Sequence, residues 1–232
     1  MAFITGHLTP IISLNGRIVT PTSGGASGDH IIEIGQIIGQ ENETTTQNYS
    51  YSYITQNALT FDGTQYVSLS IAPKNTTRVE VAFKRSATSD YAFVFGSRSA
   101  ASANDGVALA YNPSNCYPIF GSARTSISGA AAVDTVHTAV ICQDGYFLDV
   151  AKLKSYDDMS FLGTYPLCIG GVNTGGSIDS RRYKGELYAV DIYENDVLQA
   201  SLVPATRVSD NAVGLIDLVS LTFYEQTGAE ET

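Results

Sequence analysis

Short runs of apolar residues, separated by glycines and polar turn residues, fill most of the chain. In residues 79–85 apolar and charged side chains alternate, because Val79, Val81 and Phe83 share one parity and the charged residues take the other. This alternation is typical of a strand with one buried and one wet face. Further short runs of strand character occupy residues 91–96, 106–111, 136–143, 145–152 and 166–172. About ten to twelve such strands with no long helix predict an all-β fold, a two-sheet antiparallel sandwich.

One stretch near the C-terminus departs from simple alternation. Between residues 186 and 194 apolar side chains fall on both parities, which predicts a central strand covered on both sides. Asn195-Asp196 predicts a tight turn into a returning strand over residues 197–203, and Pro204 ends that strand because it cannot donate a ladder hydrogen bond. A last pair of strands is predicted over residues 213–218 and 221–225.

Residues 1–56 differ from the rest, with apolar patches, no lysine and a single arginine. Asn15-Gly16 predicts a hairpin, and residues 21–29 a flexible connector. Residues 30–39 fit a strand or a short helix, with the strand favoured by their isoleucines and glycines. Alternating tyrosines predict a further strand with one aromatic face: Tyr49, Tyr51 and Tyr53.

So short an apolar segment buries little surface alone. Residues 1–56 are therefore expected to form an attachment or oligomerisation segment. The alternative is that they add strands to the sandwich.

Composition narrows the class of partner. The net charge of −10 argues against nucleic-acid binding, which needs clustered basic residues. No apolar run approaches the roughly 18 residues of a membrane span, and the N-terminus lacks the basic start of a signal peptide. The expected site of synthesis is therefore a cytoplasm. The three cysteines, Cys116, Cys142 and Cys168, show no metal-binding spacing. Cys142 and Cys168 lie in apolar runs and are predicted to be small buried residues, which fits folding in a reducing compartment.

Two groups of residues carry a resemblance to a known family. The first is a predicted hairpin over residues 58–71, closed at Asp62-Gly63, with the pattern Phe61, Asp62, Gly63, Tyr66 and Val67. The second lies near the C-terminus and consists of Ile192-Tyr193, Val203-Pro204, Gly214-Leu215-Ile216-Asp217 and Phe223-Tyr224. Together they resemble laminin-G-like, concanavalin-A-like jelly-roll domains, in particular those of bacteriophage and prophage structural proteins. The resemblance implies a jelly-roll domain over residues 57–232.

Some proteins of this fold are laminarinase-like hydrolases, which need paired carboxylates on one strand face. The nearest set here is Glu186, Asp191 and Glu194. Glu186 and Asp191 are five positions apart, so a regular strand would send them to opposite faces. Glu186 and Glu194 share a parity but lie about 27 Å apart along a strand. Neither carboxylates nor histidines (His7, His30 and His137) supply a catalytic set, so no enzyme is predicted.

Laminin-G-like domains often bind calcium at a sandwich rim, which the resemblance makes a candidate cofactor here. The candidate oxygen donors are Asn104, Asp105, Asp157, Asp158 and Asp179, and solvated loop acids are the favoured alternative. A saccharide could also lie on aromatic and planar polar side chains at the loops. The candidate ligand-binding residues are Tyr111, Asn112, Asn115, Tyr117, Asn173, Arg181, Arg182 and Tyr183.

The leading hypothesis is a non-enzymatic bacteriophage virion protein, made in the host cytoplasm, that acts as a fibre, tail-associated or capsid-decorating subunit. It would attach to other virion proteins through residues 1–56, form a homo-oligomer with a trimer as the favoured form, and display the jelly roll toward host or environmental glycans. One alternative is a bacterial carbohydrate-binding module or an inactive relative of laminarinase-like hydrolases. Another is a purely architectural virion subunit without a ligand.

Overall fold

The computed structural model describes residues 53–86, 91–100, 105–129, 131–157 and 160–228. Before them it gives the backbone of four short strands, β1 (Ile12–Leu14), β2 (Arg17–Val19), β3 (Pro21–Ser23) and β4 (His30–Ile32). All regular elements in these ranges are strands. No helix capable of crossing a membrane occurs among them.

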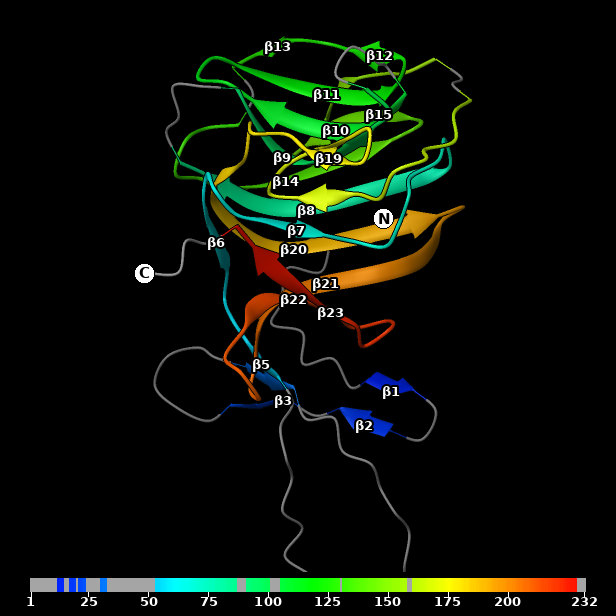
Figure 1. Cartoon of the computed structure of the whole chain (residues 1–232). Helices are drawn as coiled ribbons and strands as arrows, with labels where there is room; N and C mark the ends of the chain where they lie inside the picture. Colours follow the sequence, from blue (N-terminus) through cyan, green and yellow to red (C-terminus); the bar gives the residue numbers. More distant parts are fainter. Residues whose placement is uncertain are drawn as a thin grey trace, which may run out of the picture.

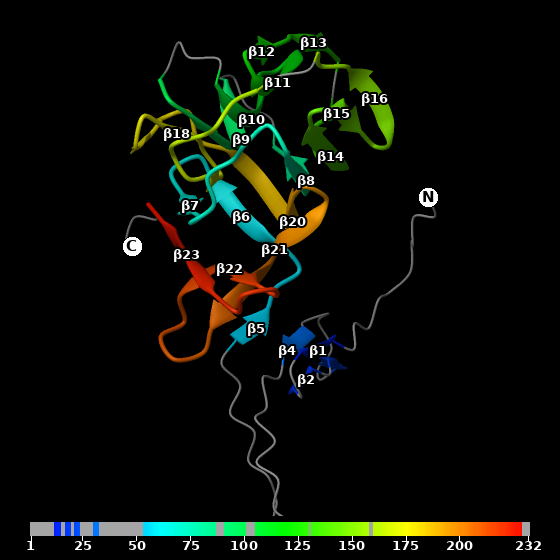
Figure 2. The same ribbon diagram turned by 90° about the vertical axis from the view of Figure 1, so that its right-hand side faces the viewer.

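Two sheets make up the sandwich, and Figure 2 shows them side by side, with β7 and β18 on one side and β8 and β14 on the other. The first sheet has at its centre β8 (Thr77–Arg85) paired with β20 (Lys184–Glu194). Beyond β8 lie β14 (Val136–Cys142), β15 (Gly145–Leu148) and β16 (Ala151–Lys154). Beyond β20 lie β6 (Leu59–Asp62), β21 (Val197–Arg207), β5 (Tyr53–Thr55) and β22 (Val213–Asp217).

The second sheet lies in front of the first in Figure 1. It runs through β7 (Tyr66–Ser68), β17 (Cys168–Ile169), β9 (Ala92–Arg98), β10 (Gly106–Tyr111) and β11 (Asn115–Gly121). Two short strands, β12 (Ala123–Arg124) and β13 (Ile127–Ser128), pair with the outer edge of β11. The small hairpin of β18 (Asn173–Thr174) and β19 (Ser177–Ile178) runs beside β9, with β18 parallel to it. Finally β23 (Phe223–Thr227) pairs with both β22 and β7 and so joins the sheets.

The main core fills the space between the sheets. On β8 buried and half-buried residues alternate strictly, which sends Val79, Val81 and Phe83 inward. These side chains are at most 1% exposed, and they belong to one cluster with Phe95 and Leu109 of the second sheet. The predicted all-β two-sheet sandwich is thus confirmed, because burial follows the period of two on the strands that carry the core.

The prediction that β20 is covered on both faces is wrong. Its pairing with β8 shifts register between Leu187 and Ala189, which is a β-bulge. Leu187 is buried before the bulge, and Val190 and Ile192 are buried after it. The extra residue changes parity in mid-strand, so apolar residues on both parities face one core and the other face stays half-exposed.

The predicted hairpin over residues 58–71 is also wrong. The strands β6 and β7 do not pair with each other, since β6 joins β20 while β7 joins β17 and β23. The turn between them carries the chain from one sheet to the other. Side chains close it in place of a ladder: Asp62 Oδ1 accepts a hydrogen bond from the Thr64 amide at 2.8 Å, and Gln65 Oε1 accepts one from the Asp62 amide at 2.7 Å.

At the N-terminal side, β1 and β2 pair across Asn15-Gly16, which confirms that predicted hairpin. The predicted connector at residues 21–29 is wrong at its start, because β3 occupies Pro21–Ser23 and pairs with β4. Of the two possibilities left open for residues 30–39, the strand holds at His30–Ile32. β4 pairs with β5, and β5 with β21 of the first sheet. The backbone therefore continues the first sheet into this segment, and its role as an oligomerisation element stays a prediction.

Candidate functional site

A second, smaller apolar cluster lies on the outer face of the second sheet. It consists of Phe93, Ala108, Ala110, Ile119 and Val172, all at most 3% exposed. In Figure 1 the β18–β19 hairpin crosses in front of this sheet. The half-buried rings of Tyr91 and Tyr117 pack against the cluster. An aromatic surface therefore exists outside the main core.

The rings at this edge form a continuous set. The centroid of Tyr91 lies 5.1 Å from that of Phe93, with the planes at 81°, and 4.9 Å from that of Tyr117, with the planes at 55°. Both spacings fall in the favourable range for tilted and edge-to-face aromatic pairs. Tyr91 directly precedes β9 and Tyr117 lies on β11, so these contacts connect two strands that both pair with β10.

Guanidinium groups surround these rings. The Arg124 Cζ atom lies 5.5 Å from the centroid of Tyr91 and 5.4 Å from that of Tyr117. The Arg181 Cζ atom lies 5.5 Å from the centroid of Tyr91, and that of Arg98 lies 5.2 Å from the centroid of Phe93. We call the exposed or half-exposed residues Tyr91, Tyr117, Arg124 and Arg181 the arginine–tyrosine patch.

A single carboxylate organises two of these arginines. Asp179 Oδ1 accepts hydrogen bonds from the Arg181 amide at 3.0 Å and from Arg181 Nε at 2.9 Å. Its Oδ2 atom accepts hydrogen bonds from Arg181 Nη2 at 2.5 Å and from Arg98 Nη2 at 3.3 Å. These hydrogen bonds, above all those from Arg181, lower the pKa of Asp179 to about 2. Asp179 is therefore an ionised anchor that fixes the guanidinium plane of Arg181.

A loop before β11 positions Tyr117. Asn112 Nδ2 donates a hydrogen bond to the Tyr117 hydroxyl at 2.9 Å, while Asn112 Oδ1 accepts from the Asn115 amide at 2.8 Å. Arg85, only 6% exposed, donates to the Asn112 carbonyl at 3.2 Å and to the Ala131 carbonyl at 2.9 Å. The loop is thus fastened from below, and Tyr117 is preorganised.

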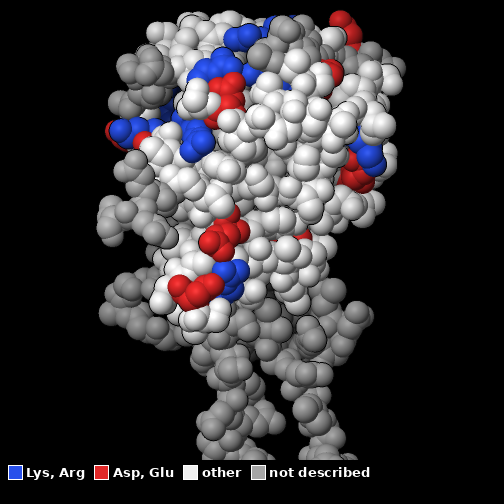
Figure 3. Space-filling model, viewed as in Figure 1, with Lys and Arg blue, Asp and Glu red and all other residues white. Residues whose placement is uncertain are grey.

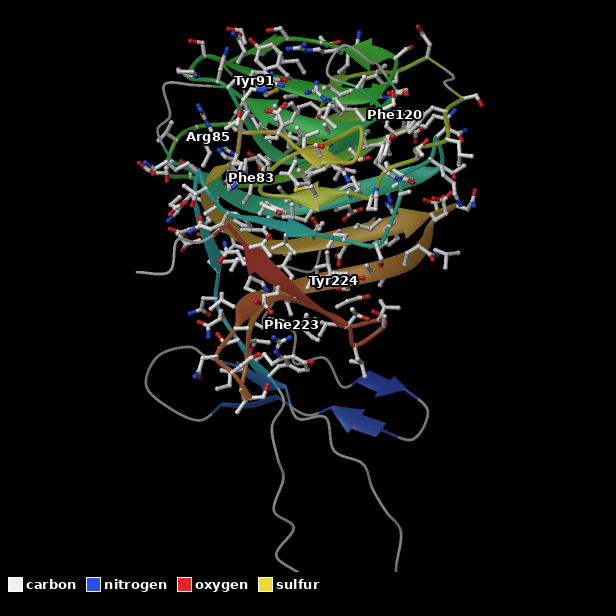
Figure 4. All side chains as sticks on the ribbon, in the orientation of Figure 1. Phe83, Arg85, Tyr91, Phe120, Phe223 and Tyr224 are labelled. Carbon is white, nitrogen blue, oxygen red and sulfur yellow. The ribbon has the colours of Figure 1, made fainter. Side chains whose placement is uncertain are left out.

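Positive charge gathers in and beneath the patch, where the guanidinium groups of Arg98, Arg124 and Arg181 meet one carboxylate, that of Asp179. Figure 4 places Tyr91 at the top of the sandwich, far from Phe223 and Tyr224 on β23. In Figure 3 the Lys and Arg atoms collect in the upper part of the face seen, around one group of acidic atoms, while most of the face carries no charge. This local excess contrasts with the net charge of −10 of the whole chain.

The predicted ligand-binding residues fall in different places. Asn112, Tyr117 and Arg181 come together in or under the patch. Tyr111 and Tyr183, each 2% exposed, point into the main core and do not reach the surface. The remaining three hold loops: Asn173 donates to the Pro166 carbonyl at 3.1 Å, Asn115 pairs with Ser128, and Arg182 donates to the Thr64 carbonyl.

Tyr91, Arg98 and Arg124 are the residues of this site that the sequence did not single out. They meet Tyr117 and Arg181 only because β9 and β11 both pair with β10, and β12 pairs with the outer edge of β11. The sequence did not predict strand β11, because Pro118 lies within it and proline is rare inside strands. β12 pairs with residues 119 and 120, and β13 with residues 115 and 116. The amide that proline lacks therefore coincides with a gap between two partner strands.

The calcium candidates do not converge within the described residues. Asp105 Oδ1 accepts a hydrogen bond from the Ser99 amide at 3.0 Å, Asp157 is exposed, and Asp179 is bound by arginines. Asn104 and Asp158 lie outside the described residues. No three His, Cys, Asp or Glu side chains gather to form a metal site in the part of the chain that the structure describes.

Of the carboxylates considered for catalysis, Glu186 and Asp191 lie on the outer face of the first sheet, so the argument that parity separates these two is wrong. The bulge in β20 places Glu186 and Asp191 on the same face. Asp191 is directly opposite Glu80 of β8, and its negative charge adds to burial in raising the pKa of Glu80 against the effect of Arg78. Glu186 accepts hydrogen bonds from Lys84 at 2.5 Å and Tyr188 at 2.6 Å, which lower its pKa.

The other candidates have structural partners. Glu194 accepts hydrogen bonds from Thr76 and, at 3.0 Å, from Thr77. The two ring nitrogens of His137 lie 2.6 Å from Asp149 Oδ2 and 3.3 Å from the Ala132 carbonyl oxygen. His7 lies outside the described residues, and of His30 only the backbone is described. The three cysteines are free, with Cys116 and Cys168 buried and Cys142 half-buried.

No protein-family model matches the chain, and no curated protein sequence matches it either. Among solved structures the chain is similar to a heptameric SAP-like pentraxin from Limulus polyphemus, with 13% identity and a TM-score of 0.44 over 63% of this chain and 77% of that one. It is similar to the CBM40 of the Ruminococcus gnavus IT-sialidase, with 14% identity and a TM-score of 0.45 over 62% and 93% of the two chains. It is also similar to domains LG4-5 of the mouse laminin alpha1 chain, with 12% identity and a TM-score of 0.42 over 76% and 52%.

Proposed function

We propose that the chain is a non-enzymatic saccharide-binding sandwich domain whose binding surface is the arginine–tyrosine patch. One observation supports this most directly: the rings of Tyr91 and Tyr117 lie outside the main core and are flanked by the guanidinium of Arg124. A pyranose presents an apolar C–H face that stacks on aromatic rings and hydroxyl groups that accept hydrogen bonds from planar polar groups. The patch offers both kinds of contact.

The absence of catalysis is part of the proposal. Retaining glycoside hydrolysis needs a carboxyl acid and a carboxylate nucleophile about 5 Å apart. Glu186 is held ionised by Lys84 and Tyr188, which suits an ion pair better than an acid. Glu80 faces Asp191 but forms a salt bridge with Arg78 at 3.1 Å. Incubation with the saccharides that bind should release no new reducing ends, and turnover lost in Glu80→Gln or Asp191→Asn would overturn this part.

The setting in which the domain acts is a second level of the proposal. The resemblance of the C-terminal strands favours a phage virion subunit that is attached through residues 1–56 and presented in several copies. A homo-oligomer makes weak saccharide contacts useful, because linked sites bind with a high effective concentration. If the chain is instead a bacterial carbohydrate-binding module, it would use the same patch outside a virion. If it is a purely architectural virion subunit, the patch would bind no ligand.

A glycan array with the full chain, presented multivalently, tests the function. Replacing Tyr117 by alanine removes a stacking surface, and binding to every saccharide recognised should fall about tenfold or more. Tyr188→Ala is the matched control, because Tyr188 is a half-exposed tyrosine on the outer face of the first sheet. If no saccharide on the array is bound, the architectural subunit is favoured. If Tyr117→Ala and Tyr188→Ala reduce saccharide binding equally, the binding site lies outside the patch.

A further inference from the structure

The way Asp179 binds Arg181 leaves one edge of that guanidinium available. Nε and Nη2 of Arg181 both donate to Asp179, at 2.9 and 2.5 Å. Within the described residues no hydrogen bond uses Nη1 of Arg181. Its side chain is 42% exposed although its plane is fixed. A preorganised donor that faces solvent loses little entropy when it binds an acceptor.

Arg124 supplies a second available cation beside it. This exposed residue lies on the short edge strand β12 and has no ion-pair partner in the described part of the chain. Its guanidinium and that of Arg181 are both 5.5 Å from the centroid of the Tyr91 ring. The two groups therefore flank one aromatic ring, with Tyr117 next to it.

The charges at this spot do not cancel. Arg98 lies beneath the patch with its side chain 4% exposed, and it shares Asp179 with Arg181. After burial, the positive charge of Arg181 is the main cause that lowers the pKa of Arg98, and Arg124 adds to it. All three arginines also counter the rise that burial causes in the pKa of Tyr91. An anion bound here would relieve the mutual repulsion of the guanidiniums.

We propose that the patch recognises acidic saccharides, with Arg124 and Arg181 binding a carboxylate or a sulfate ester while the sugar ring lies against Tyr117. This inference rests on the proposed function and specifies its ligand. Guanidinium groups suit both anions because their planar donors match the spacing of two oxygens. The chain as a whole carries −10, so a small, localised anionic group is attracted while a long polyanion is repelled away from the patch.

The test compares ligands that differ only in charge. The carboxylate arm uses immobilised galacturonic acid and its methyl ester, and the sulfate arm uses immobilised galactose 6-sulfate and galactose. The full chain should bind the acidic member of at least one pair about 10- to 100-fold more tightly. That preference should weaken as salt rises from about 0.05 to about 0.5 M, because the Debye length then shortens from roughly 14 to roughly 4 Å and the charges are screened.

Variants locate the effect. Arg124→Gln and Arg181→Gln should each remove most of the preference for the acidic ligand, so that the acidic and the neutral member of a pair bind with similar affinity. Arg207→Gln is the matched control, because Arg207 is an arginine at the opposite end of the sandwich, stacked on Phe223. Since Arg181 also binds Asp179, Arg124→Gln carries the test if the Arg181 variant fails to fold.

The outcomes separate the two proposals. The chain could bind neutral and acidic ligands equally well, with binding lost in Tyr117→Ala and unaffected in Arg124→Gln. That result would contradict the preference for acidic saccharides and support the saccharide-binding site. No binding to any ligand would overturn both. An equal loss in Arg207→Gln would show that the preference arises from overall charge and not from the patch.

Discussion

The two outer faces of the sandwich carry the same kinds of residue but distribute charge differently. On the first sheet Lys84 pairs with Glu186 at 2.5 Å, and Arg78 with Glu80 at 3.1 Å. On the second sheet two arginines share Asp179, and Arg124 adds a cation without an ion-pair partner among the described residues. One face neutralises its charges, and the other keeps a positive excess above aromatic rings.

The difference follows from how each face is assembled. Lys84 and Glu186 are direct partners in the register of β8 and β20, so the ladder itself brings opposite charges together. The patch is built by β9, β11, β12 and the segment before β20, and no ladder pairs its arginines with acids. Charge that is balanced by register serves solubility and local stability, whereas charge concentrated by convergent segments is available for a ligand.

The largest effect is expected from removing the anchor of the unbalanced face. Asp179→Asn deprives Arg98, whose side chain is 4% exposed, of a carboxylate, and should lower the free energy of unfolding by about 2–3 kcal/mol. Urea unfolding of the full chain measures it. Asp210→Asn is the control, because it breaks a pair with Arg207 in which Asp210 is 49% exposed, and its effect on the free energy of unfolding should be much smaller. Equal losses would contradict the difference between buried and exposed pairs.

Acid should reveal the same anchor. Hydrogen bonds from Arg181 are the main cause that lowers the pKa of Asp179 from 3.8 to about 2, so its folded form binds a proton less readily than the unfolded one. Its contribution is therefore fully present above about pH 4 and is lost as pH falls through 2, by about 1 kcal/mol after solvent screening. The difference in unfolding free energy between wild type and Asp179→Asn should narrow from pH 5 to pH 2.5. A difference that stays constant would contradict the role of the charge.

Local pattern was sufficient where a strand obeys a single period or a turn has distinctive residues. The alternation of residues 79–85 predicted β8, and Asn195-Asp196 predicted a turn whose two residues have φ of 50° and 60°. Short polar side chains tolerate this left-handed conformation better than others do. Asn112, Tyr117 and Arg181 were recognisable because they flank turns near the ends of strands.

Other features depend on contacts that sequence alone does not contain. Nothing in the letters LYAV marks the bulge beside Tyr188, yet that one residue decides which face Asp191 occupies. Tyr91 and Arg124 are unremarkable in sequence and gain a role only through the neighbours of β11. The interior position of Tyr111 could not be predicted either. A tyrosine beside a turn can lie at the surface, or it can be buried if its hydroxyl has a hydrogen-bond partner. Here that partner is the hydroxyl of Tyr146, at 3.0 Å.

The hydroxyl groups of the two patch tyrosines should contribute unequally. Tyr117→Phe loses the hydrogen bond from Asn112 at 2.9 Å and should cost about 1 kcal/mol of unfolding free energy. The Tyr91 hydroxyl is buried and has no hydrogen-bond partner in the described part of the chain, so Tyr91→Phe should be neutral or stabilising by up to about 1 kcal/mol. Thermal unfolding of both variants decides it. A larger loss for Tyr91→Phe would mean that its hydroxyl has a partner after all.

The smallest effect is expected on the outer face of the first sheet, where the charge of Glu80 is not fully compensated by Arg78. Burial and the charge of Asp191 raise the pKa of Glu80, with Arg78 acting against them. Folding therefore favours its protonated form, and stability falls as pH rises through the range between the unfolded and folded pKa values. Glu80→Gln should raise the free energy of unfolding at pH 7 by at most about 0.5 kcal/mol, and the gain should vanish near pH 4. Glu186→Gln is the counterpart, because Lys84 lowers the pKa of Glu186, and its small effect should have the opposite sign. If Glu80→Gln destabilises the protein as Glu186→Gln does, the salt bridge with Arg78 outweighs the repulsion by Asp191, and this face is as fully balanced at Glu80 as it is at Glu186.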